Sequence, residues 1–309
     1  MSKNYYIIPV FISHQGCPHQ CVFCNQDRIA GVYDEVTAED VRERIDSYLD
    51  TMNTKNSTIE VSFFFFFFTA IPAIKQKELL AVAREYKNKG LIHKIRLSTR
   101  PDAINGYILS YLKEFKVDII ELGVQSLDDN VLRLAGRGHS AYDVENASRL
   151  IKAEGFTLGH QIMPGLPGDT KEIDLATIKK SIEMKPDIAR IYPALVIKDT
   201  PMETMYNRGE YEPYSLDMAV EVSKEMLKLY NAAKVKVIRI GLQPTDTIAE
   251  GKDVVAGPFH PAFRELVEGS LICENIKEKT NESSDIIIEI NSKDISKLYC
   301  NKKQYFNEF

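Results

Sequence analysis

Short apolar segments rich in Val, Ile and Phe alternate with longer amphipathic segments from residue 5 to residue 240. The apolar segments that have the length and composition of β-strands lie at residues 5–13, 58–64, 94–98, 118–123, 156–162, 187–192 and 235–240. The segments between them carry apolar residues at helical spacing, as at Val41, Ile45 and Leu49. Such alternation is typical of a parallel sheet covered by helices. The sequence therefore predicts an α/β fold, a partial (β/α)6-7 barrel of parallel strands that spans residues 1–245 as one domain.

The chain changes in character after Gly241. We predict a helix at residues 261–274, a polar linker at 275–284 and a strand at 285–290. Residues 246–309 are accordingly predicted to be a small C-terminal α+β extension. Its last part carries four lysines between Lys293 and Lys303, together with Tyr299 and Tyr305. Such a tail can contact an RNA backbone and stack an aromatic ring on a base, or it can be a solvated tail of the domain.

Three cysteines, Cys17, Cys21 and Cys24, lie within eight residues, directly after the first predicted strand. Thiolate is the usual ligand of iron–sulfur clusters, and three thiolates on one loop can hold three corners of a [4Fe-4S] cluster. The fourth iron then keeps an open position, at which a metal can bind and activate a small molecule. The loop could instead hold zinc with His14 or His19, although zinc sites usually add a second cysteine knuckle. Unliganded thiols are the remaining alternative, because an odd cysteine count without a secretory signal does not fit a disulfide framework.

The composition narrows the functional classes. The net charge of −5 and the pI near 5.8 argue against broad, non-specific nucleic-acid binding but allow a local basic patch. No apolar run approaches the ~20 residues that span a membrane, and the N-terminal residues lack the layout of a signal peptide. We therefore expect a cytoplasmic protein without a membrane partner, in a compartment where thiols stay reduced.

The cysteine spacing, Cys-x3-Cys-x2-Cys with Phe23 before the third cysteine, resembles the signature of the radical S-adenosylmethionine (SAM) superfamily. Further stretches resemble the branch that contains the Elongator catalytic subunit and oxygen-independent coproporphyrinogen III oxidase. They are Ser98-Thr-Arg-Pro-Asp102, Glu121-Leu-Gly-Val-Gln-Ser126, Ala135-Gly-Arg-Gly-His139 and Met163-Pro-Gly-Leu-Pro-Gly168. The resemblance covers residues 5–245, and no stretch after residue 245 resembles the acetyltransferase domain of the Elongator subunit.

The resemblance implies two cofactors, a [4Fe-4S] cluster on Cys17, Cys21 and Cys24, and S-adenosyl-L-methionine at the open iron. In this family an electron, from a donor such as flavodoxin or ferredoxin, cleaves SAM reductively. The product is a 5'-deoxyadenosyl radical that abstracts hydrogen from the substrate. For the substrate the branch implies two kinds, a tRNA uridine or a small molecule such as a porphyrinogen.

The resemblance also implies which side chains contact SAM. Gln125 and Gln161 would bond its ribose, Arg137 would pair with its carboxylate, and Phe23 would lie at the cofactor. In the porphyrinogen oxidase an aspartate stands at the position of Gln161. The alternative for the two glutamines is an ordinary polar strand end, and for Arg137 a surface-loop arginine.

Six consecutive phenylalanines, Phe63 to Phe68, are the most unusual feature of the chain. Relatives in this branch typically read Phe-Gly-Gly-Ser-Phe-Thr here, and alignment on Phe64 and Thr69 places Phe65–Phe67 at Gly-Gly-Ser. Glycine lets the backbone approach SAM, whereas phenylalanine adds a ring and penalises positive φ by roughly 1–2 kcal/mol. We interpret the run as an alteration that impairs SAM binding more than cluster binding. It gives weight to an alternative function, a non-catalytic cluster- or zinc-binding protein with RNA as a candidate ligand.

Overall fold

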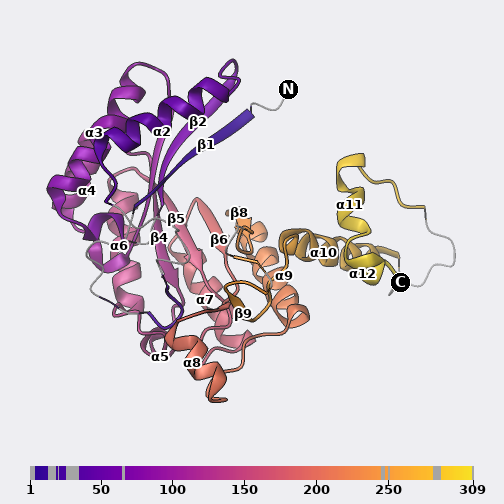
Figure 1. The fold of residues 1–309 in the computed structure, drawn as a ribbon. Helices are drawn as coiled ribbons and strands as arrows, with labels where there is room; N and C mark the ends of the chain where they lie inside the picture. Colours follow the sequence, from indigo (N-terminus) through magenta and orange to yellow (C-terminus); the bar gives the residue numbers. More distant parts are fainter. Residues whose placement is uncertain are drawn as a thin grey trace.

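A seven-stranded parallel sheet forms the centre of the protein, shown as a computed structural model in Figure 1. The structure describes residues 4–12, 19, 21–25, 35–64, 67–244, 248–249, 251–280 and 287–307. In spatial order the strands are β1 (Asn4–Phe11), β2 (Ser57–Phe64), β3 (Lys94–Thr99), β4 (Ile119–Gln125), β5 (Thr157–Ile162), β6 (Ile188–Ile191) and β8 (Lys236–Ile240). Because β1 and β8 are both edges of this sheet, the barrel is open between them. The predicted α/β partial barrel is thereby confirmed.

Helices connect successive strands, and Figure 1 shows them along the outer side of the sheet in its indigo and purple half. The longer helices of the barrel are α2 (Ala38–Thr51), α3 (Ala73–Asn88), α4 (Gly106–Glu114), α6 (Ala141–Ala153), α7 (Lys171–Glu183) and α9 (Leu216–Ala232). Shorter elements are η1 (Phe68–Ala70), η2 (Pro101–Ala103), α5 (Asp129–Leu134) and α8 (Pro201–Asn207). Side-chain caps fix where helices begin: Ser140, for example, caps α6 in a capping box with Asp143. Such a cap is worth about 1 kcal/mol.

Charged side chains from four strands lie on the inner face of the sheet. They are Glu60, Arg96, Glu121 and Arg190, all buried, and we call them the charge layer. Glu121 accepts hydrogen bonds from both arginines, with Nε of Arg190 2.8 Å from its Oε2. Nε of Arg96 lies 2.7 Å from Oε1 of Glu60. Two guanidinium groups are thus balanced by two carboxylates, which is what makes burial of these charges tolerable.

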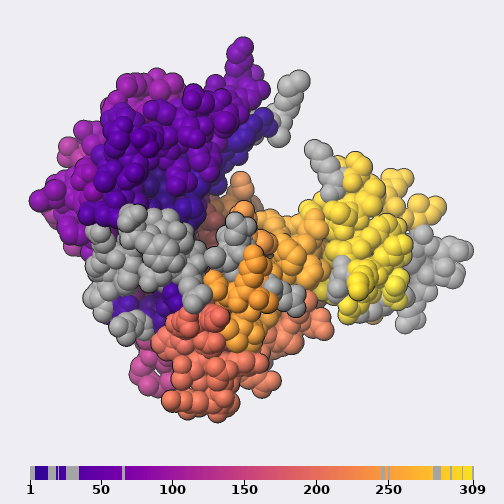
Figure 2. All heavy atoms as spheres, in the orientation of Figure 1, coloured from indigo at the N-terminus to yellow at the C-terminus, as the bar shows by residue number. Residues whose placement is uncertain are grey.

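A small antiparallel sheet pairs β7 (Val196–Ile197), which lies between β6 and α8, with β9 (Val254–Ala256) of the C-terminal part. The elements that follow are α10 (Phe263–Thr280), η3 (Ser292–Asp294), α11 (Ile295–Leu298), η4 (Asn301–Lys303) and α12 (Gln304–Asn307). In Figure 2 an open notch separates the yellow C-terminal helices from the indigo and purple N-terminal part. None of the helices in the described residues is both long and apolar enough to cross a membrane.

Two C-terminal predictions are wrong. Residues 275–280 were predicted as linker but continue α10, because Glu274 on this helix pairs with Lys224 and Lys228 of α9 and supports a polar helix. Residues 287–290, in the predicted strand 285–290, have no strand structure, and Ile287 is 92% exposed. A strand needs a partner strand for its backbone hydrogen bonds, and no described strand pairs with this segment.

Candidate cofactor site

A cavity of about 220 Å³ opens at the carboxyl ends of the parallel strands. Its lining residues come from several strand ends and from the cysteine loop, and they are Phe11, Phe23, Cys24, Phe64, Ser98, Gln161, Met163, Tyr192, Pro193, Leu195, Ile197 and Leu242. Most of these side chains are apolar, with a few polar groups among them, as is usual for sites that bind small molecules. Because the chemistry of parallel barrels lies at this end of the strands, the cavity is the candidate site.

The structure brings two residues of the predicted cluster loop, Phe23 and Cys24, to this cavity. Cys21 is buried, and its carbonyl oxygen accepts a hydrogen bond from Cys24 N at 3.0 Å, so both cysteines belong to one tight turn. Cys17, the third predicted ligand, and His14 lie outside the described residues. In the part of the chain that the structure describes, no three His, Cys, Asp or Glu side chains gather to hold a metal. The complete ligand set therefore stays a prediction.

The cysteine loop is clamped between two segments that are distant in sequence. On one side Val22 N donates to the carbonyl oxygen of Ala135 at 3.0 Å. On the other side the carbonyl oxygen of Val22 accepts from Met202 N at 2.8 Å, and Nδ2 of Asn25 donates to the carbonyl oxygen of Lys198 at 3.1 Å. The loop before α6 and the start of α8 thus fix the position of the thiols, although the sequence predicted neither contact.

Arg137 points at the cysteine loop from the turn after α5. Its side chain is almost completely buried, with 2% exposed, and its Nη1 lies 3.5 Å from Sγ of Cys21. Nη2 donates to the carbonyl oxygen of Gly123 at 2.6 Å, whereas Nε has no partner among the described residues. Burial lowers the pKa of Arg137, while the Cys21 thiol opposes that shift. The pairing of Arg137 with the carboxylate of SAM remains a prediction. The sequence did not predict the contact of Arg137 with Cys21, a proposed ligand of the cluster.

Gln125 ends β4 in a conformation that is unusual for a residue other than glycine. Its φ is +66°, and the pairing of β4 with β5 shifts register between Gly123 and Gln125. The side chain is 1% exposed, and neither Nε2 nor Oε1 has a partner among the described residues. Strained backbone of this kind costs about 1–3 kcal/mol and clusters at functional sites. Gln125 is not among the residues that line the cavity, but its carbonyl oxygen accepts a hydrogen bond at 2.9 Å from Met163 N, and Met163 lines the cavity.

Gln161 at the end of β5 lines the cavity and is oriented by the charge layer. Its Nε2 donates to Oε2 of Glu121 at 2.7 Å and approaches Oγ of Ser98 at 3.3 Å. With the amide nitrogen fixed in this way, Oε1 has no partner within the described residues. The structure thus gives Gln161 a buried acceptor that a ligand hydroxyl could satisfy.

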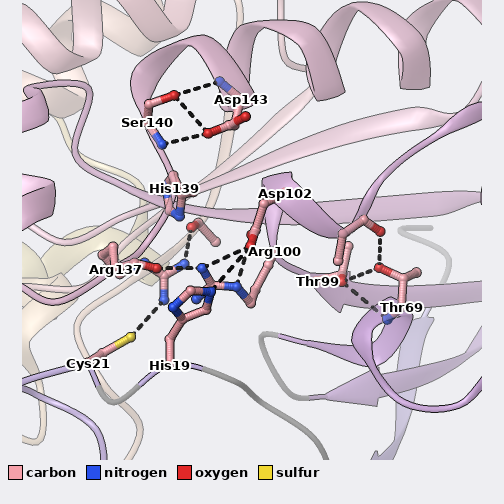
Figure 3. A network of polar contacts seen from close by, with 12 residues as sticks. His19, Cys21, Thr69, Thr99, Arg100, Asp102, Arg137, His139, Ser140 and Asp143 are labelled. Carbon is pink, nitrogen blue, oxygen red and sulfur yellow. Dashed lines mark hydrogen bonds and ion pairs between the residues drawn. The ribbon is translucent and has the colours of Figure 1, made fainter.

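A polar network beside the cysteine loop joins His19, Asp102, Arg100 and Arg137, as Figure 3 shows. Asp102 accepts from Nε and Nη2 of Arg100 at 2.9 and 3.3 Å, and lies 3.6 Å from Nε2 of His19. Arg100 Nη2 also donates to the carbonyl oxygen of Arg137. The His19 ring packs on Gly138, whose φ is +68° and where a Cβ would overlap the ring. The stretch from Ser98 to Asp102 supported the resemblance, but nothing in the sequence predicted these contacts.

The phenylalanine run divides between the core and the cavity. Phe63 and Phe68 are buried with their ring centroids 5.1 Å apart, whereas Phe64 lines the cavity and stacks on Phe11. Phe65 and Phe66 lie outside the described residues. Phe67 is 1% exposed and has a φ of −149°, so the expected penalty for positive φ does not apply at this position.

Comparison with known sequences identifies the family of this chain. The radical SAM superfamily profile matches residues 11–179, and the radical SAM C-terminal domain profile matches residues 186–272. Over 129 residues the chain is 36% identical to the tRNA uridine(34) acetyltransferase of Methanocaldococcus infernus, a match that covers 41% of this chain and 24% of that protein. Over 138 residues it is 33% identical to Elongator complex protein 3 of Homo sapiens, covering 44% of this chain and 25% of that protein.

The structure resembles that of the Methanocaldococcus infernus Elp3 protein with an N-terminal deletion, with a TM-score of 0.67 and 23% identity. That similarity covers 91% of this chain and 64% of the other, and it shows the shared fold. The chain covers about a quarter of the length of the two curated relatives, within the radical SAM part of these proteins. The resemblance stated from the motifs is thus confirmed: this chain belongs to the radical SAM superfamily and is Elp3-like.

Proposed function

We propose that this chain is an iron–sulfur enzyme that binds SAM in the cavity at the strand ends and cleaves it reductively. The observation that carries the proposal is that Phe23, Cys24 and Gln161 line one cavity in a chain of the radical SAM superfamily. A [4Fe-4S] cluster held by the cysteine loop would supply one electron, received from a donor such as flavodoxin or ferredoxin, for cleavage of a C–S bond of SAM into methionine and a 5'-deoxyadenosyl radical. Residues 1–245 would form the catalytic barrel, and residues 246–309 an extension of it.

The residues around the cavity fit these cofactors. Cys21 and Cys24 offer the soft thiol ligands that iron–sulfur clusters use, and we propose Cys17 as the third. A buried polar group without a partner costs about 1–3 kcal/mol, and such groups are present on Gln125 and Gln161. Ribose hydroxyls can both donate to and accept from these amides, so SAM would satisfy them. Phe23, whose ring centroid lies 6.0 Å from the Arg137 guanidinium, would help to exclude water from the site.

For the substrate we propose a uridine of tRNA, with a small molecule as the competing choice. The proposal rests on the relatives, because the Methanocaldococcus protein is named as a tRNA uridine(34) acetyltransferase. The cavity lining includes the aromatic side chains Phe11, Phe64 and Tyr192, on which a base extruded from the RNA could stack. Acetyl transfer is not proposed, since the matched region lies within the radical SAM part of that relative.

A second candidate, a cluster-binding protein without catalysis, is favoured by one observation. Phe64 lines the cavity, and the next residues, up to Phe67, stand where relatives in this branch carry Gly-Gly-Ser. Phe67 belongs to the hydrophobic core, but rings at positions 65 and 66 would compete with the methionine end of SAM for space. We propose that this chain binds SAM weakly for this reason.

Anaerobic reconstitution with iron and sulfide, followed by SAM and dithionite, tests these proposals. We expect equal amounts of bound iron and sulfide, and more 5'-deoxyadenosine after Gly-Gly-Ser is restored at positions 65–67. A cluster without 5'-deoxyadenosine in both proteins would support the non-catalytic candidate. Zinc without sulfide would contradict the cluster itself. For the substrate, added tRNA should increase 5'-deoxyadenosine formation relative to a matched RNA hairpin without the uridine.

A further inference from the structure

Arg137 is engaged by the protein at both of its terminal nitrogens. Nη1 lies 3.5 Å from the sulfur of Cys21, and Nη2 donates to the carbonyl oxygen of Gly123 at 2.6 Å. This geometry holds the guanidinium against a predicted cluster ligand without any contribution from SAM. Hydrogen bonds to cluster sulfurs and nearby charge are two of the factors that set the reduction potential of iron–sulfur clusters.

The charges around Arg137 do not balance among the described residues. Arg100 and Arg137 are both nearly completely buried, with 1% and 2% exposed. Asp102 pairs with Arg100 at 2.9 Å, whereas Arg137 forms no ion pair with a carboxylate in the described part of the chain. His139, which also faces this group, is neutral because burial and then Arg137 lower its pKa to about 2. With His19 left out of the count, Arg100 and Arg137 face one carboxylate, so one positive charge is in excess. A buried charge is costly unless an anion pairs with it.

The cysteine loop is the neighbour that could supply that anion. Three thiolates around a [4Fe-4S] core carry a net negative charge, and reduction by one electron adds another. A fixed positive charge nearby stabilises the reduced form more than the oxidised form, since Coulomb energy grows with the charge of the partner. We propose that Arg137, together with Arg100 and Asp102, sets the reduction potential of the cluster, with Arg137 raising it and Asp102 lowering it. This inference rests on the proposed cluster and assigns these three residues a positioning and electrostatic role.

The sign of the effect distinguishes this role from a structural one. In redox titrations of the reconstituted protein without SAM, followed by electron paramagnetic resonance, Arg137→Gln should shift the midpoint potential to a more negative value. Asp102→Asn removes a negative charge at nearly constant size, so it should shift the potential to a more positive value. The charge-conserving Arg137→Lys should stay closer to the wild type than Arg137→Gln. Arg133→Gln is the matched control, because the Arg133 side chain on α5 is exposed and hydrogen-bonds only Asn130 among the described residues.

Each outcome decides the inference. Shifts of opposite sign for Arg137→Gln and Asp102→Asn, with Arg133→Gln unchanged, support it. Shifts of the same sign would mean that both substitutions merely loosen the cysteine loop. Unchanged potentials with weaker SAM affinity would mean that Arg137 only binds the carboxylate of SAM. Either result overturns the inference but leaves the proposed cluster intact. If Arg137→Gln holds no cluster, the sign of the Asp102→Asn shift decides. A wild-type protein that takes up no iron and sulfide would overturn both proposals.

Discussion

The Glu121→Gln substitution removes one charge from the charge layer while keeping the size of the side chain. Glu121 is 1% exposed and accepts from Arg190 at 2.8 and 3.1 Å, and from Arg96 as well. Removing one partner of a buried ion pair costs about 3–5 kcal/mol, because the other charge is left buried and uncompensated. We expect the free energy of unfolding to fall by that amount and Tm to fall on the order of 10 °C. The orientation of Gln161 should be lost as well, since its Nε2 donates to Glu121 at 2.7 Å.

Urea titrations followed by circular dichroism measure this cost, with Glu154→Gln as the matched control. Glu154 pairs with Lys113 at 3.0 Å on the exposed surface, where such a pair is worth about 0–1 kcal/mol.

Burial raises the pKa of Glu121, but Arg190 and Arg96 more than offset this effect, so the pKa of Glu121 is lowered overall. A lowered pKa stabilises the fold above the unfolded-state value of ~4.3, and this contribution is lost as the pH falls below it. Wild type and Glu121→Gln should therefore differ at pH 7 and converge in acid. A cost no larger than that of the control would refute the reasoning.

Three further predictions concern the loop, the phenylalanine run and a buried histidine. Restoring Gly-Gly-Ser at positions 65–67 should raise 5'-deoxyadenosine formation under dithionite far more than it changes Tm; equal rates at equal iron content would show that the run is harmless. Gly138→Ala should lower the free energy of unfolding by about 1–2 kcal/mol, because residue 138 has a positive φ. The new Cβ should also displace the His19 ring, so a chelator should remove iron faster from the reconstituted protein. Unchanged iron release would mean that the cysteine loop does not depend on this packing. Burial lowers the pKa of His160 to about 3, whereas a histidine in an unfolded chain has a pKa of ~6.5. The neutral His160 side chain therefore contributes to stability above pH ~6.5, and this contribution is lost as the pH falls toward 3. His160→Gln should flatten that part of the pH dependence, and identical slopes for the two proteins would argue against a neutral buried imidazole.

The strands were predictable because each is a short segment rich in Val, Ile, Leu or Phe that lies between longer amphipathic segments. The segment predicted at 94–98 is β3 at Lys94–Thr99, and the segment predicted at 235–240 is β8 at Lys236–Ile240. The placement of Phe23, Cys24 and Gln161 at one end of the sheet followed from topology alone, since the carboxyl ends of parallel strands share one edge.

The contacts that hold the site could not be predicted, because they join residues that are far apart in sequence. Nothing local to His19 indicates that Asp102 lies 3.6 Å away, and nothing local to Cys21 indicates the position of Arg137. In the C-terminal part, local composition was misleading. Residues 275–280 are polar but helical, because ion pairs of Glu274 attach α10 to α9, and residues 287–290 are partly apolar but form no strand.

Iron and sulfide analysis of cysteine variants tests the central claim most directly. After anaerobic reconstitution, the wild type and a Cys273→Ser/Cys300→Ser variant should bind iron and sulfide in equal amounts. A variant with Cys17, Cys21 and Cys24 all changed to alanine should bind neither and should lose the iron-dependent absorbance. Full iron and sulfide in the triple variant, or zinc without sulfide in the wild type, would contradict the account.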